Sequence, residues 1–268
     1  MSTQYNAVQG PYDEVRKNTI AILERVNVRE KVLPFVKDAN VLDLACGSGF
    51  YTYPLLAWGA KKVVGVDISA VMLTQARNEG EATGLSASVS FVEADCSREE
   101  AYPGGPFDLV VACWLLNYAA SGKEMVNMFR NAALNLNDRG HFVAVMPPPT
   151  HDPAALIQAE NNVRRRGTGG FFSTMTGSVE DGITLHRHAD TVAGVLDFDC
   201  YHLRKEVYEV AAREGGFRGE LSWSTTSVPD DFMELPDRYG ESRNGGAEPE
   251  ELQTYADVPF YGLLTLAK

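Results

Sequence analysis

The sequence predicts an α/β protein with a doubly wound, mostly parallel, seven-stranded sheet and an inserted hairpin or lid. Short strand-like segments alternate with helical segments over residues 38–146, as in consecutive right-handed βαβ units. These strand segments are apolar throughout, which is typical of strands covered on both faces. The chain has 268 residues, 44% of them hydrophobic, and is long enough for one large domain that carries an insertion.

Strands and helices alternate regularly in the first part of the chain. The strands are expected at residues 40–45, 62–67, 89–94, 107–112 and 141–146, and the helices at 12–35, up to about 58, at 70–82 and at 122–136. Ser69 is a suitable N-cap for the helix at 70–82.

The pattern changes after three consecutive prolines at 147–149. The sequence then predicts a helix at 153–165, an antiparallel hairpin of residues 182–188 and 192–200, a helix at 204–214, and strands at 218–227 and 260–267. We expect an N-terminal helical cap (1–37), a Rossmann-like cofactor-binding domain (38–149 and 203–268) and an inserted substrate lid (150–202). Residues 167–177, rich in Gly, Ser and Thr, would be its mobile part.

Charge and composition narrow the function class. The net charge of −12 argues against a nucleic-acid partner, because phosphate binding needs a basic surface. Residues 228–257 hold −7 of this charge and are interpreted as a solvated acidic loop. No apolar run approaches the roughly 20 residues that span a bilayer, and the first residues do not resemble a signal peptide. We therefore expect a cytoplasmic protein that binds no membrane, with four reduced cysteines and no metal site.

A glycine-containing turn after the first strand is the first element of the predicted site. It runs from Asp43 through Ala45, Cys46 and Gly47 to Gly49. Glycines permit a tight turn and the close approach of a ligand to the backbone, and the helix that follows offers free N–H groups. Such a turn is a weak signal alone, because glycine pairs are common in loops.

Three further elements follow later strands. Asp67 ends the second strand, where a carboxylate can accept hydrogen bonds from the hydroxyls of a ribose. After the third strand, Asp95 could accept a hydrogen bond from an adenine amino group and Cys96 could supply a backbone N–H. Cys113 and the residues that follow it close the fourth strand. All four elements therefore fall at the carboxyl ends of successive strands, the edge where open α/β sheets bind ligands.

These elements resemble the motifs of class I S-adenosylmethionine-dependent methyltransferases. Residues 41–49 are similar to the first motif of that family, 64–69 to the second and 91–95 to the third, and the resemblance covers about residues 38–146. It implies S-adenosylmethionine as the cofactor. Ala45 stands where glycine is frequent in the family, and we expect a negative φ there, which alanine tolerates. Residues 44–52 and 114–119 look more specifically like toxoflavin-type and related natural-product methyltransferases.

The resemblance also implies a role for individual residues. Ala45, Gly47 and Gly49 would face the methionine part, Asp67 the ribose, Ile68 and Met72 the adenine ring, and Asp95 and Cys96 its edge. Asp43, Cys46 and Cys113 complete the predicted cofactor set. The rival interpretation, a nicotinamide oxidoreductase, fits less well because Thr52 stands where its GxGxxG fingerprint needs the third glycine.

The methyl acceptor is expected beside the sheet edge. Substrate candidates are Tyr5, Tyr12, Trp114, Asn117, Tyr118, His188 and Tyr201. Further candidates from the insertion at 150–202 are Phe171, Phe172, His186 and His202. Trp, Tyr and Phe walls suit a flat aromatic acceptor. A basic run at 164–166 is interpreted as a solvated helix end. Methyl transfer needs alignment of the nucleophile more than a fixed catalytic motif, and no catalytic residue is predicted.

The sequence therefore predicts methyl transfer from S-adenosylmethionine to O, N or S of a small aromatic or heterocyclic metabolite. The alternatives are a protein methyltransferase and a non-catalytic protein that binds S-adenosylmethionine as a regulator. We expect a monomer or homodimer with no nucleic-acid or membrane partner. The identity of the acceptor stays open.

Overall fold

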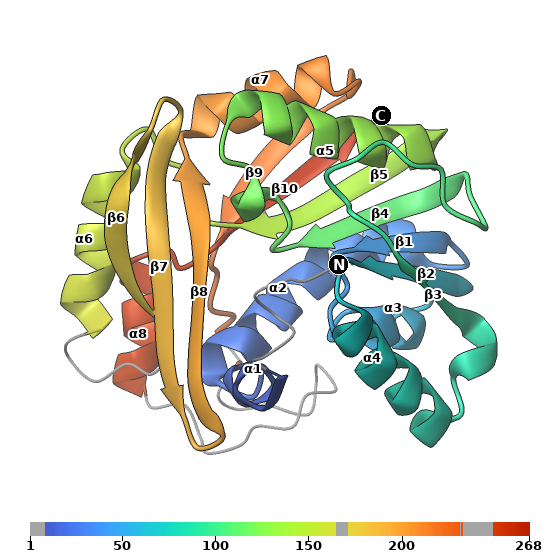
Figure 1. Ribbon diagram of the computed structural model, residues 1–268, viewed down its shortest axis with the longest axis horizontal. Helices are drawn as coiled ribbons and strands as arrows, with labels where there is room; N and C mark the ends of the chain where they lie inside the picture. Colours follow the sequence, from blue (N-terminus) through green and yellow to red (C-terminus); the bar gives the residue numbers. More distant parts are fainter. Residues whose placement is uncertain (1–8, 165–170, 231, 233–248) are drawn as a thin grey trace.

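The computed structural model describes residues 9–164, 171–230, 232 and 249–268 (Figure 1). Its main sheet has seven strands in the order β3-β2-β1-β4-β5-β10-β9. The strands are β1 (Asn40–Leu44), β2 (Lys62–Asp67), β3 (Val89–Glu93), β4 (Phe107–Cys113), β5 (Leu136–Met146), β9 (Leu221–Thr225) and β10 (Gly262–Ala267). Strands β1 to β5 pair in parallel, and β10 is antiparallel to β5 and β9. The predicted doubly wound, mostly parallel sheet is confirmed.

Helices cover both faces of this sheet. The helices of the described residues are α1 (Gln9–Val15), α2 (Thr19–Val36), α3 (Thr52–Ala57), α4 (Ala70–Thr83), α5 (Gly122–Asn135), α6 (Pro153–Arg164), α7 (Lys205–Glu214) and α8 (Pro249–Asp257), with short 3-10 turns η2 (Ser86–Ser88) and η3 (Leu116–Tyr118). As predicted, Ser69 caps α4, accepting a hydrogen bond from Met72 N at 3.2 Å.

Alternate residues of β1 bury into two separate cores. Leu42 packs in the core beneath α5 and α7, whereas its neighbour Val41 packs in the core beneath α2 and α3. Both side chains are fully buried. Because consecutive strand residues point to opposite faces, a strand covered on both sides must be apolar at every position, which is the pattern that the sequence shows.

A second, smaller sheet stands beside the main one. It contains β6 (Phe172–Val179), β7 (Gly182–Thr191) and β8 (Gly194–Leu203), all antiparallel in that order (Figure 1). Helix α6 packs on it through Ile157, and α1 packs on it through Val15. Nε2 of His202 donates to the carbonyl of Pro148 at 2.9 Å, which ties β8 to the segment that follows β5.

Several predicted boundaries are wrong. The helix expected at 12–35 is two helices, α1 and α2, with a break between them. The expected hairpin has a third strand, β6, and this strand occupies most of the segment predicted to be mobile; residues 167–170 lie outside the described part of the chain. Strand β5 begins at Leu136, and the acidic segment contains α8. Among the described residues, no helix has both the length and the apolarity that crossing a bilayer requires.

Candidate functional site

The turn between β1 and α3 takes a left-handed path. Ala45 has φ of +58° and Gly47 has φ of +55°. The expectation of a negative φ at Ala45 is therefore wrong: alanine occupies a conformation that L-residues enter at a cost of roughly 1–2 kcal/mol. Cys46 N donates to Val66 O at 3.0 Å and so fixes the turn against the end of β2.

Asp67 lies across this turn at the carboxyl end of β2. Its Oδ2 accepts from Gly47 N and its Oδ1 accepts from Ser69 N, each at 2.8 Å. Burial raises the pKa of Asp67, and the N–H groups of Ser69, Gly47 and Ile68 oppose that rise. A carboxylate offers about four acceptor positions, so these three groups leave room for an outside hydroxyl donor.

Asp43, at a buried position in β1, stabilises the turn that follows this strand. Its side chain is buried, and its Oδ2 accepts from the hydroxyl of Thr52 at 2.6 Å. Burial raises the pKa of Asp43 to about 7, against the effect of the Thr52 hydrogen bond. Asp43 therefore holds the first turn of α3 in place and is not among the residues that line the adjoining cavity.

Gly49 is required by packing. Its φ is +94°, and a Cβ there would stand 2.7 Å from the ring of Tyr53. Gly47 differs, because a Cβ on it would meet only Tyr12 Oη, 3.8 Å away. Of the two motif glycines, Gly47 faces the cavity and Gly49 faces a neighbouring side chain.

A cavity of about 1150 Å³, its mouth included, opens at this edge of the sheet. The residues that line it come from three parts of the chain. From the main-sheet strands and the segments next to them they are Ala45, Gly47, Asp67, Met72, Cys113, Trp114, Asn117, Tyr118, Pro147, Phe260 and Tyr261. From the N-terminal helices and the link between them they are Tyr12, Val15, Arg16, Ile20, Ala21 and Glu24. The second sheet and the residue before it supply Phe171, Arg187, Phe198 and Cys200.

A buried carboxylate, Glu24 of α2, organises the N-terminal wall. Its Oε1 accepts from Arg16 at 3.1 Å and from the hydroxyl of Tyr51 at 2.6 Å, and its Oε2 accepts from Trp114 Nε1 at 2.9 Å. Arg16 also donates to Tyr12 Oη at 2.7 Å. Nε of Arg16 is buried and has no hydrogen-bond partner among the described residues. The guanidinium beside the Gly47 turn thus keeps one N–H for a ligand.

Trp114 follows β4 in an unusual conformation. Its φ is +63°, which is uncommon for a bulky residue and costs of order 1–3 kcal/mol. Its backbone N–H donates to Val145 O at 2.8 Å, and its indole is held by Glu24. These two contacts fix the Trp114 side chain in the wall of the cavity.

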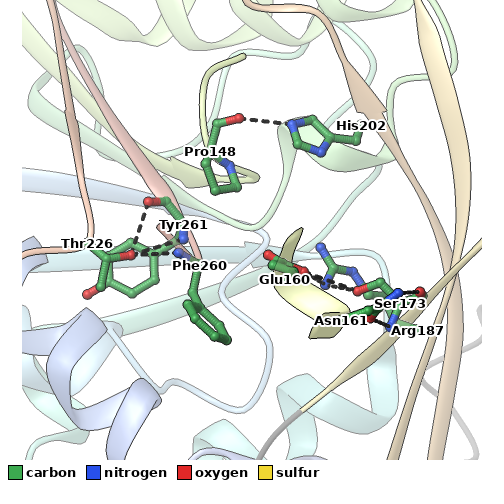
Figure 2. A network of polar contacts seen from close by, with 9 residues as sticks. All are labelled: Pro148, Glu160, Asn161, Ser173, Arg187, His202, Thr226, Phe260 and Tyr261. Atoms are coloured by element: carbon green, nitrogen blue, oxygen red, sulfur yellow. Dashed lines mark hydrogen bonds and ion pairs between the residues drawn. The ribbon is translucent and has the colours of Figure 1, made fainter. Parts of the chain in front are cut away.

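The second sheet contributes polar groups as well as rings. Arg187 of β7 is buried, and its Nη1 donates to Glu160 Oε2 at 3.4 Å and to Ser173 Oγ (Figure 2). Burial raises the pKa of the Cys200 thiol, whereas hydrogen bonds from Arg187 and Asn117 oppose the rise. Arg187, Cys200 and Asn117 therefore meet at one sulfur atom, although each comes from a different element.

Aromatic rings form much of the remaining wall. Phe171 and Phe198 pack edge to face with centroids 5.4 Å apart. Phe260 and Tyr261 belong to the segment that enters β10, and their backbone N–H groups both donate to Thr226 Oγ1, at 2.9 and 3.2 Å (Figure 2). Polar anchoring of this segment keeps the two rings in position.

The predicted site residues divide between the cavity and its surroundings. The cofactor candidates that line it are Ala45, Gly47, Asp67, Met72 and Cys113, and the substrate candidates are Tyr12, Trp114, Asn117 and Tyr118. Asp43, Cys46, Gly49, Ile68, Asp95, Cys96, Tyr201 and His188 are not among the lining residues, and neither are Phe172, His186 and His202. Tyr5, Arg165 and Arg166 lie outside the described residues, as does the Arg164 side chain.

Two of these outer residues have evident structural partners. Asp95 Oδ1 accepts from the N–H and hydroxyl of Ser97, at 3.0 and 2.6 Å. His188 lies on the outer face of the second sheet, where its Nδ1 contacts Asp197 Oδ1 at 2.7 Å. Sequence reasoning missed Arg16, Glu24 and Arg187, which have no local motif; charged residues among apolar neighbours in α2 and β7 were the available signal.

The family comparison agrees with this geometry. Residues 41–140, which contain β1 to β4 and the strand-end turns, match a protein family described as a methyltransferase domain. This part of the chain is therefore similar to a methyltransferase domain. Its cofactor is S-adenosylmethionine, in keeping with the acidic residue at the end of β2 and the turn that faces it.

Several curated relatives of the chain are also methyltransferases. A malonyl-[acyl-carrier protein] O-methyltransferase of Legionella pneumophila is 31% identical over 137 residues, covering 51% of this chain and 46% of the relative. An mRNA cap guanine-N(7) methyltransferase of Caenorhabditis elegans is 33% identical over 139 residues, covering 47% of this chain and 36% of the relative. The chain thus spans less than half the length of either relative.

Similarity of fold extends further than similarity of sequence. The crystal structure of an S-adenosylmethionine dependent methyltransferase from Mesorhizobium loti has a TM-score of 0.56 and 20% identity, covering 90% of this chain and 96% of that one. This likeness of fold therefore extends beyond the matched family segment to most of the chain.

Proposed function

We propose that the chain transfers a methyl group from S-adenosylmethionine to an O, N or S atom of a small, largely aromatic metabolite bound inside the cavity. One observation carries the proposal: the strand-end turns, the N-terminal helices and the second sheet line one cavity. Ligand sites are typically concave and largely apolar, with a few convergent polar groups. The lining of this cavity combines both kinds of group, with Asp67 and Arg187 among mostly apolar side chains.

The main-sheet wall fits the donor. Asp67 keeps acceptor capacity for the ribose hydroxyls, as argued above, and Met72 supplies apolar surface for adenine beside it. The unpaired Nε–H of Arg16, close to the Gly47 turn through Tyr12, suits the carboxylate of the methionine part. The predicted roles of Ile68, Asp95 and Cys96 at the adenine ring remain part of this proposal.

The opposite wall suits the acceptor. Phe171, Phe198 and Tyr118 offer ring surfaces from the second sheet and η3. A flat molecule buries well against such walls. Residues Phe198 and Cys200 of the second sheet lie on this side, and the predicted role of residues 150–202 as an inserted substrate lid is part of this proposal. An acceptor on a large RNA or protein surface would have to present its reactive group through the same opening.

Positioning accounts for most of the chemistry that these residues can perform. S-adenosylmethionine supplies a methyl group already activated on a sulfonium. The chain contributes alignment and exclusion of water, which reduce the entropic part of the barrier. Glu24 is assigned to positioning, because its oxygens already accept from Arg16, Tyr51 and Trp114. No histidine is among the described residues that line the cavity.

Cofactor binding tests the donor half. Asp67→Ala removes the carboxylate that would hold the ribose, and the Kd for S-adenosylhomocysteine should rise at least tenfold by isothermal titration. Asp138→Asn, an exposed change remote from the turn, is the control and should leave that Kd within twofold. An unchanged Kd in Asp67→Ala would reject the assignment.

Turnover separates the remaining alternatives. Incubation with S-adenosylmethionine and small aromatic acids, amines and phenols should yield S-adenosylhomocysteine together with a methylated small molecule. Methylation only of protein or RNA would favour those acceptors, and binding without turnover on any acceptor would favour a regulator. The net charge of −12 supports a small molecule over RNA.

A further inference from the structure

A charged residue occupies an inward position on the second sheet. Arg187 alternates along β7 with His186 and His188, which face outward, and shares the inner face with Leu185 and Ala189, both buried. Its own side chain is only 8% exposed. Burial of a guanidinium is costly unless the group is paired and hydrogen-bonded, so the identity of its partners decides what it does.

The protein satisfies one end of this guanidinium. The hydrogen bonds from Arg187 to Glu160 and Ser173 both use Nη1 (Figure 2). Asn161 Nδ2 in turn donates to the backbone carbonyl of Ser173 at 2.7 Å. Arginine has five N–H groups. Among the described residues, both side-chain hydrogen bonds from Arg187 to oxygen use Nη1, and Arg187 lines the cavity, so its other N–H groups are open to a ligand. Two parallel N–H groups of a guanidinium match the two oxygens of a carboxylate.

An unpaired acceptor lies next to Arg187. Asn117 is 2% exposed and lines the same cavity, and its Oδ1 has no hydrogen-bond partner among the residues that the structure describes. Leaving such an oxygen buried without a donor costs about 1–3 kcal/mol. Asn117, Arg187 and Cys200 line the same cavity, and both Asn117 and Arg187 influence the Cys200 thiol, so one ligand can reach both.

We propose that the acceptor carries a carboxylate, bound by Arg187, next to an N–H or O–H donor that reaches Asn117 Oδ1. This inference rests on the proposed function and names its substrate class: an aromatic acid with an adjacent amino or hydroxyl group. The donor does not account for the site, because Arg16 at the Gly47 turn is the cation available to its carboxylate. Glu160 lies 3.4 Å from the Arg187 guanidinium and repels a dianion more strongly than a monoanion, so a singly charged carboxylate fits better than a phosphate.

Three matched probes separate the two contacts. They are 3-amino-2-naphthoate, which has both groups, 2-naphthoate, which lacks the donor, and 3-amino-2-naphthamide, which lacks the charge. Each is titrated into the full chain saturated with S-adenosylhomocysteine, and Kd is measured by calorimetry. We expect 3-amino-2-naphthoate to bind at least tenfold more tightly than the amide and at least threefold more tightly than 2-naphthoate.

Variants then assign each preference to a residue. R187Q/E160Q removes the two buried charges together, avoids an unpaired carboxylate, and should bring the acid-to-amide ratio close to one. E160Q alone keeps the guanidinium and should keep the preference for the acid. N117L should abolish only the preference for the amino group. The Kd for S-adenosylhomocysteine should stay within twofold in all three.

The outcomes distinguish this inference from the proposed function. Equal binding of acid and amide by the wild-type chain, an acid preference that survives in R187Q/E160Q, or no binding of any probe below 5 mM would overturn the inference alone. Failure of the wild-type chain to bind S-adenosylhomocysteine would instead overturn the proposed function. The unfolding curve of each variant gives its thermal midpoint and shows separately whether the substitution destabilises the fold.

Discussion

Nε1 of Trp114 donates to Oε2 of Glu24 at 2.9 Å and joins the residue after β4 to a helix that precedes the whole sheet. The same carboxylate pairs with Arg16. One buried side chain therefore holds an indole with a left-handed backbone and a guanidinium in the wall of a single cavity.

Replacing Glu24 should damage stability and ligand binding together. Glu24→Gln keeps the size of the side chain and leaves the Arg16 guanidinium without its carboxylate. Breaking one side of a buried ion pair costs about 3–5 kcal/mol, and we expect a loss of about 3 kcal/mol in urea unfolding at pH 7. Weaker binding of S-adenosylhomocysteine should accompany it.

Glu30→Gln is the matched control, because Glu30 lies in the same helix and is exposed. Surface substitutions of this kind usually change stability by no more than about 0.5 kcal/mol. Equal unfolding free energies for the two variants would show that the Glu24 network contributes nothing.

The left-handed backbone at Ala45 gives a second prediction. Ala45→Gly relieves roughly 1 kcal/mol of strain at φ of +58° and adds a comparable entropic cost of roughly 0.5–1 kcal/mol. The unfolding free energy should therefore change by less than about 0.5 kcal/mol. Ala159→Gly, an exposed change within α6, should lose about 1 kcal/mol. A loss at Ala45 as large as that at Ala159 would contradict the argument.

Asp43 should make the fold less stable as the pH rises from acid to neutral. Its folded pKa is raised by burial to about 7, whereas an unfolded Asp titrates near about 3.9. The stability that Asp43 contributes is fully present below its unfolded pKa and is lost as the pH rises through its folded pKa. The loss is of order 4 kcal/mol at most, from about 1.36 kcal/mol for each pKa unit.

Asp43→Asn tests this sign, since asparagine can still accept from Thr52 and has no proton to lose. Urea unfolding at pH 5, 6, 7 and 8 should show wild type losing stability relative to Asp43→Asn up to about pH 7, then no further. Asp138→Asn, at an exposed position, should follow the wild-type curve. Parallel curves for wild type and Asp43→Asn would refute the effect.

His202 should act in the opposite direction. Burial lowers its folded pKa to about 4, below the unfolded value of about 6.5. Its contribution is present above pH 6.5 and is lost as pH falls toward 4, by about 3 kcal/mol at most. His202→Gln, which can still donate to Pro148 O, should reduce this acid sensitivity in unfolding measurements.

His151→Gln provides the comparison, because the His151 side chain is 78% exposed. It should change the acid limb of the stability curve less than His202→Gln does. If His202→Gln loses stability between pH 6.5 and 4 as steeply as wild type, another group is responsible.

The sequence predicted the main sheet because its strands are buried on both faces and so are apolar without interruption. The second sheet was harder. Residues of β6 are mostly Ser, Thr and Gly, and only one face of this strand is covered, so its composition resembles a loop. The start of β5 was missed because Asn137 to Gly140 are polar yet extended.

The parts of the site that lie at a single strand end could be predicted from the sequence. The contacts between residues far apart in the chain could not. Gly47 and Asp67 belong to recognisable strand-turn patterns. Glu24 and Trp114 are 90 positions apart, and nothing in either neighbourhood indicates the other. Arg187 and Asn117 likewise meet only because the second sheet docks on η3.

A cavity whose walls come from three separated stretches of the chain also has a mechanical consequence. A molecule that contacts all three walls links them, and its binding free energy adds to the free energy of unfolding. At a hundredfold excess over Kd, that gain is about 2.7 kcal/mol. Occupancy by donor and acceptor would then slow amide exchange most in α1 and β6 to β8, which contribute two of the three walls.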